Sequence, residues 1–209
     1  MTTPKGLLLT FSTGEEPTSC LEEIGDTLAR VGAAVWPLDL SGSPQEIKSL
    51  LDQESLTTNE SQRVLDHFLL SRERLLNVIK AARREPNLFG GGELSTYVTN
   101  HDYWYPQMWI AQAGEDYSRF DRLHVNTADD GTGVDEVLQM VAGAGMKIIL
   151  QQPDQSLVTL ELECPDIESG WTVTYNGGSP HIGSVSSARP GTKLVTQVVG
   201  PASWQMRYV

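Results

Sequence analysis

The sequence predicts a mainly β protein: a jelly roll preceded by a helical α/β segment. Apolar residues recur at helical spacing over roughly the first 89 residues and at every second position after residue 90. The glycines 90–92 mark the change. Short strand-like stretches then follow, separated by Gly, Pro, Asp and Asn, as in sandwiches and barrels. We therefore divide the chain into a mostly helical segment, 1–89, and a β domain, 90–209.

Capping residues predict where two helices of the first segment begin. Ser19 and Glu22 have the spacing of a capping box, in which two backbone amides are satisfied reciprocally. The apolar residues that follow recur every three or four positions and end at Gly32. A second helix is expected from Ser43, because Pro44 after it suits the first position of a helix.

A third helical stretch covers about residues 60–84 of the first segment. Its apolar residues recur at helical spacing, and Ser71 is a candidate for dividing it into two helices. The same segment contains two short apolar runs, at 7–11 and 34–40, that we expect to be strands.

The β domain is expected to consist of short strands around a cavity. The predicted strands are 94–99, 107–111, 122–126, 136–141, 146–151, 157–164, 171–175, 193–199 and 204–208. In the stretch 157–164, Val158, Leu160 and Leu162 alternate with polar residues, so one face of that strand should be buried. A jelly roll packs eight such strands into a double sheet.

The composition excludes some classes of partner. The chain has 27 acidic and 15 basic residues, a formal net charge of −12, which argues against binding to nucleic acid or to anionic membranes. There is no apolar run of about 18 residues that would span a membrane. We expect a cytoplasmic protein, in which Cys20 and Cys164 are buried and form no metal-type pair.

Two short segments of the β domain carry ligand-type side chains beside glycines. The first contains His124 and Asn126, and then Glu136 with Gly143 seven residues after it. The second runs from Gly170 through 176–178 to His181. Two imidazoles and one carboxylate that converge in a small barrel would make a metal site. His67, in the third helical stretch, is instead interpreted as a surface or packing residue.

These spacings resemble the two motifs of the cupin superfamily, over about residues 94–199. The first cupin motif has two histidines, a glutamate and a glycine seven residues later, and His124, Glu136 and Gly143 match it. Asn126 stands where the second histidine usually lies, and the gap before Glu136 is longer than usual. The second motif matches in spacing up to His181, with Asn176 in place of proline.

The resemblance implies a divalent transition metal held by His124, Glu136 and His181. We expect Fe(II), with Mn, Ni, Co or Zn as alternatives, since two imidazoles and a carboxylate leave open positions on the ion. Asn126 would be a weak fourth ligand or would hold a bound water. His181 is expected on the turn that follows Tyr175.

Two further residues are candidates for contact with the substrate. Arg122 has the parity of His124 and Asn126, so we expect it to face the barrel interior or its mouth. There it would bind a substrate carboxylate or pair with an acidic residue of the protein. The alternative is a position at the end of the strand, in solvent. Tyr105 belongs to an aromatic run, and an aromatic-lined pocket suits a planar or apolar small molecule.

The predicted function is that of a metal-dependent cupin enzyme acting on a small organic substrate, such as an aromatic or carboxylic acid. An Fe(II) dioxygenase is the specific hypothesis. A cupin lyase or isomerase without oxygen chemistry is one alternative, and a non-catalytic ligand-binding or assembly module is another. The resemblance also implies a homodimer.

Overall fold

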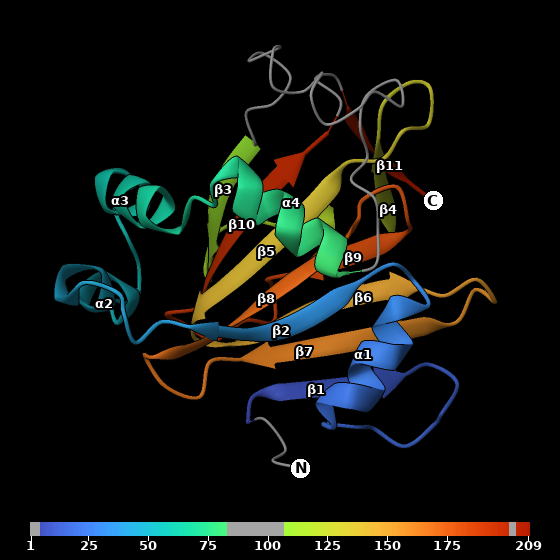
Figure 1. The fold of residues 1–209 in the computed structure, drawn as a ribbon, viewed down its shortest axis with the longest axis horizontal. Coiled ribbons are helices and arrows are strands. Elements are labelled where there is room, and N and C mark those ends of the chain that lie inside the picture. The colour runs from blue at the N-terminus through green and yellow to red at the C-terminus, as the bar shows by residue number, and fades with distance from the viewer. Residues whose placement is uncertain (1–4, 83–106, 201–203) are drawn as a thin grey trace.

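Two antiparallel β-sheets form the centre of the computed structural model, which describes residues 5–82, 107–200 and 204–209 (Figure 1). In spatial order the first sheet consists of β1 (Leu7–Phe11), β7 (Leu157–Glu163), β6 (Ala144–Gln151), β9 (His181–Ser184), β4 (His124–Thr127) and β11 (Gln205–Tyr208). The second consists of β2 (Ala34–Asp39), β8 (Ser169–Asn176), β5 (Asp135–Ala142), β10 (Lys193–Val199) and β3 (Gln107–Gln112). This arrangement confirms the predicted mainly β fold.

The predicted strands are found with small changes in their bounds, apart from two cases. The strand expected at 94–99 lies outside the described residues. The strand expected at 122–126 begins only at His124. One observed strand, β9, was not predicted, because its four residues contain a single large apolar side chain, Ile182. Gly143 joins β5 to β6 with a φ of 84°, and a Cβ there would lie 2.4 Å from the Cα of Thr192.

The N-terminal segment contributes one strand to each sheet. β1 pairs with β7, from Leu7 opposite Leu162 onward, and β2 pairs with β8, from Ala34 opposite Thr174. The two strands expected in this segment are therefore confirmed. The boundary that we placed between residues 89 and 90 lies outside the described residues.

The described residues include four α-helices, which pack against the sheets or at their end: α1 (Leu21–Ala29), α2 (Gln45–Leu51), α3 (Thr58–Phe68) and α4 (Arg72–Ala81). The third helical stretch is divided as predicted, because Ser71 caps α4 by accepting a hydrogen bond from the Arg74 amide. The other predicted caps are wrong. Cys20 precedes α1 without a side-chain cap, and Pro44, not Ser43, precedes α2. Within the described residues, no helix is long and apolar enough to cross a membrane.

Helices cover the outer face of the second sheet, while α2 and α3 lie together at one end of the molecule (Figure 1). The covered strands β5 and β10 are therefore buried on both faces along almost their whole length. Strands β6 and β7 of the first sheet instead alternate between buried and partly exposed residues, as the sequence of 157–164 predicts. The apolar core lies between the sheets and is extended by α1.

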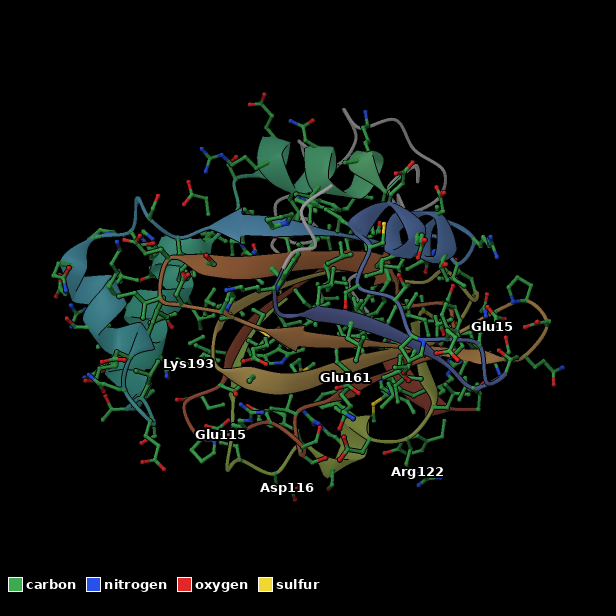
Figure 2. The ribbon with its side chains drawn as sticks, turned by 90° about the horizontal axis from the view of Figure 1, so that it is seen from below. Glu15, Glu115, Asp116, Arg122, Glu161 and Lys193 are labelled. Atoms are coloured by element: carbon green, nitrogen blue, oxygen red, sulfur yellow. The ribbon has the colours of Figure 1, made fainter. Side chains whose placement is uncertain are left out.

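Lys193 is a buried cation that ties α2 to the second sheet (Figure 2). Its Nζ donates hydrogen bonds to the carbonyl oxygens of Leu51, Gln53 and Gly191. A positive charge is favourable there, because Leu51 is the last residue of α2 and its carbonyl lies at the negative end of the helix dipole. Burial nevertheless lowers the pKa of Lys193 to about 8.

Replacing Lys193 by methionine (Lys193→Met) should lower the free energy of unfolding by about 1–3 kcal/mol, because three buried carbonyls lose their donor. Urea unfolding measures this change. An unfolded lysine titrates near pH 10.4, so between about pH 8 and pH 10 the unfolded chain binds a proton that the folded protein has released. The stability of the wild type relative to the variant should therefore rise over this range.

The control is Lys147→Met, which removes a partly exposed ion pair of 3.0 Å with Glu161. This change should cost less than about 1 kcal/mol. Equal losses in the two variants, or a wild-type advantage that shrinks between pH 8 and pH 10, would contradict the role assigned to Lys193.

Candidate functional site

Four polar side chains meet between the two sheets. His124 and Asn126 come from β4, His181 is the first residue of β9, and Glu136 reaches in from β5 of the other sheet. No more than 4% of any of these residues is exposed. His124 and His181 are direct cross-strand partners, and their ring centroids lie 4.4 Å apart.

Each histidine ring is oriented by a carbonyl two residues before it. Nδ1 of His124 donates to the carbonyl oxygen of Arg122 at 2.7 Å, and Nδ1 of His181 donates to that of Ser179 at 2.8 Å. Because a carbonyl oxygen only accepts, these contacts place the proton on Nδ1. Nε2 is therefore the ring nitrogen left for chemistry at both residues, as is usual for histidines that bind metals.

Glu136 is a buried carboxylate held by three neighbours. Its Oε1 accepts a hydrogen bond from the side-chain amide of Asn126 at 2.7 Å and lies 3.3 Å from Nε2 of His181. Its Oε2 accepts from the hydroxyl of Tyr175 at 2.9 Å. Burial raises the pKa of the Tyr175 hydroxyl, and the charge of Glu136 raises it further, so Tyr175 remains a donor.

The ionisation of the site follows from these contacts. Burial opposes charge on both Glu136 and His181, but their mutual attraction and the hydrogen bonds that each makes together outweigh it. The pKa of Glu136 is therefore lowered and that of His181 is raised. Burial and the neighbouring charge of His181 lower the pKa of His124, so that ring is neutral.

The contact between Glu136 and His181 requires a proton or a metal ion between the two atoms. Oε1 and Nε2 both carry lone pairs, so they face each other at 3.3 Å only if a proton or a metal ion neutralises their repulsion. A proton on His181 meets this need, and a divalent ion would meet it too. In addition, the buried Oδ1 of Asn126 has no hydrogen-bond partner among the described residues, so this oxygen can accept from water or bind an ion.

The described residues do not form a complete set of metal ligands as they stand. Among them, no group of three or more His, Cys, Asp or Glu side chains is arranged to hold a metal ion. The structure thus brings His124, Asn126, Glu136 and His181 into one cavity, with Glu136 and His181 in direct contact. The donor types suit a divalent ion. In the present arrangement, however, only Glu136, His181 and the Asn126 amide are in mutual contact, and His124 lies beside them.

The site opens onto a small cavity lined mostly by apolar and aromatic side chains. Besides the four polar residues, these include Trp109, Tyr117, Phe120, Leu138, Met146, Tyr175, Val185, Leu194 and Trp204. The cavity has a volume of about 40 Å³. That is room for an ion or a few waters, at roughly 10–15 Å³ each.

The structure decides two sequence-based expectations about the site. Of the positions considered for Arg122, the inward-facing one is wrong and the solvent-exposed one at the end of a strand is found (Figure 2), with the guanidinium 4.0 Å from the centre of the Tyr208 ring. The alternation that we extended to Arg122 fails because β4 begins two residues later. His181 lies on a strand rather than on the turn after Tyr175. The third expectation, for Tyr105, lies outside the described residues.

Tyr175 is the residue of the site that the sequence analysis missed. It lies directly opposite Glu136 in the pairing of β5 with β8, so both side chains point to the same face of the sheet. Its position one residue before the Asn176 turn was visible in the sequence, but the register between the two strands was not. His67, on α3, is exposed as predicted.

Comparison with known proteins supports the fold. No protein-family model matches the chain, and no curated protein does. A solved structure with the cupin fold, an acireductone dioxygenase from Bacillus anthracis with a cadmium ion in its active centre, is similar to it. The alignment covers 93% of this chain and 92% of that one, with a TM-score of 0.53 and 14% sequence identity. The chain has a cupin-like fold. At this identity the similarity indicates fold alone.

Replacing Tyr175 by phenylalanine (Tyr175→Phe) should lower the free energy of unfolding by about 2 kcal/mol, since a buried carboxylate loses a hydrogen bond while the ring packing is kept. Chemical denaturation followed by circular dichroism measures the loss. The matched control is Tyr208→Phe, whose exposed hydroxyl donates to the carbonyl of Arg119. The control should lose less than about 0.5 kcal/mol. Similar losses in both variants would show that the hydrogen bond from Tyr175 to Glu136 does not stabilise the fold.

Proposed function

We propose that the protein is a metal-dependent cupin enzyme acting on a small organic molecule, and specifically an Fe(II) dioxygenase. The observation that carries the proposal is the contact of Glu136 with His181, which either a proton or a metal ion can bridge. Beside it lie His124 and the Asn126 oxygen, which has no hydrogen-bond partner among the described residues. The similar solved structure is named as a dioxygenase with a cadmium ion in its active centre, which is consistent with a divalent ion here.

In this proposal His124 and His181 would hold the metal through Nε2, and Glu136 through its carboxylate. Asn126 would act as a weak ligand or hold a bound water. When bound, Fe(II) with such ligands supplies positions at which oxygen and substrate bind together. Mn, Ni, Co or Zn would supply Lewis-acid chemistry instead.

The protein's own groups have defined tasks around that centre. The carbonyls of Arg122 and Ser179 fix the two rings, so that their Nε2 atoms need no reorientation. Tyr175 orients Glu136 through its hydrogen bond to Oε2 and assists His181 in keeping it deprotonated. The aromatic lining limits access of water, which strengthens every charge interaction inside the cavity. Tyr105 remains a hypothesis as a residue that orients the substrate.

A second candidate function is a lyase or isomerase that needs no oxygen chemistry. It is favoured by the ion pair itself, in which a protonated His181 and a deprotonated Glu136 form an acid and a base 3.3 Å apart. Oxygen consumption with candidate aromatic acids separates the two functions, because only the dioxygenase consumes oxygen. A non-catalytic binding module would show turnover in neither assay. A homodimer in the cytoplasm remains our expectation for either enzyme.

Protein expressed in metal-supplemented medium should contain about one transition-metal ion per chain, as measured by elemental analysis. His181→Ala should weaken metal binding by more than about 100-fold, beyond the 10–100-fold effect of residues that only orient ligands. The control His67→Ala changes an exposed histidine on α3 and should leave the metal content unchanged. Wild-type protein without metal after supplementation would contradict the proposed function.

Asn126→His restores the histidine of the usual cupin motif and should tighten metal binding by about tenfold or more, since it adds an imidazole donor. The matched variant Asn126→Ala supplies no donor and should bind metal no more tightly than the wild type. Competition with a chromogenic chelator measures both affinities. If histidine at this position left the affinity unchanged, the residue would not face the metal.

A further inference from the structure

A second recess lies next to the polar cavity and shares a wall with it. It is lined by Trp109, Arg119, Phe120, Trp204 and Met206, and its volume is about 240 Å³. Trp109, Phe120 and Trp204 also line the polar cavity. These three aromatic residues therefore lie between the polar site and a recess that is large enough for a small organic molecule.

Arg119 supplies the charge in this recess. It belongs to the short 3-10 helix η2 (Ser118–Phe120), and its guanidinium carbon lies 4.5 Å from the centre of the Phe120 ring. Within the described parts of the chain, no carboxylate forms an ion pair with it. The nearby Asp116 feels its charge, but Oδ1 of that residue accepts hydrogen bonds from the amide and hydroxyl of Ser118.

The lining favours one class of ligand. Flat aromatic side chains bind flat apolar groups, and the single guanidinium matches the two oxygens of a carboxylate. A pocket with mostly apolar walls and one oriented charge is typical of small-molecule sites.

We propose that this recess binds a small aromatic carboxylic acid. Arg119 holds the carboxylate, and the ring of the acid lies against Trp109, Phe120 and Trp204. Phe120 contacts Arg119 and also His124, whose ring centroid is 5.9 Å from its own. A ligand held by Arg119 therefore lies one aromatic side chain away from the polar site. That the recess delivers a substrate rests on the proposed function; the binding of the acid does not.

The test compares benzoate with benzamide, which has the same ring and no charge. Both are titrated by calorimetry and by tryptophan fluorescence into protein freed of metal with a chelator, since Trp109 and Trp204 line the recess. Benzoate should bind about tenfold more tightly, the equivalent of 1.4 kcal/mol. Arg119→Gln should abolish this preference, and Arg119→Lys should keep only part of it, because lysine lacks the planar fork.

The control is Arg207→Gln. Arg207 is also exposed and follows Met206 of the recess, but its guanidinium is already paired with Asp129 at 2.8 Å. This variant should keep the full preference for benzoate. Equal affinity for the two compounds in the wild type, no measurable binding of benzoate, or the same loss in both arginine variants would overturn the proposal. Unchanged circular dichroism spectra verify that the variants fold.

The outcomes also distinguish this inference from the proposed function. A preference for benzoate in a protein that never binds metal would support the recess and contradict the metal-dependent enzyme. A metal-loaded protein that consumes oxygen but shows no preference for benzoate over benzamide would support the metal-dependent enzyme and contradict the recess.

Discussion

The charge of Glu136 is the constraint on which the rest of the site depends. Removing a carboxylate from water costs several kcal/mol unless opposite charge and hydrogen-bond donors surround it. Here the neighbours come from three other strands: Asn126 on β4, Tyr175 on β8 and His181 on β9. Because Glu136 and Tyr175 belong to one sheet and the other two residues to the opposite sheet, the carboxylate links the two sheets at the point where chemistry is expected.

The same constraint explains the two-sided burial of β5. If one face of β5 were exposed to solvent, water could approach Glu136 and weaken its electrostatic attraction to His181. Helix α4 packs on the outer side of this strand, where Leu75 and Ile79 meet Val137. The helical segment thus contributes to the electrostatics of the site without supplying a residue to it.

Much of the fold and the positions of the four polar residues could be predicted from the sequence. The alternation in 157–164 gave the buried face of β7, and the spacing from Glu136 to Gly143 gave the turn between β5 and β6. Local patterns do not predict the position of a side chain when that position depends on the pairing of strands distant in sequence. Tyr175 requires the register of β5 with β8, and Arg122 requires the start of β4, which its pairing with β9 and β11 determines.

The strands contributed by the N-terminal segment bear on how the protein is made. β1 and β2 are synthesised first, yet β7 and β8, their partners in the sheets, follow more than a hundred residues later. Contacts so distant in sequence form slowly, because a long loop must close before they stabilise anything. During synthesis β1 and β2 therefore remain unpaired until β7 and β8 have been made. At that stage the nascent chain exposes two apolar strands that can associate with other chains.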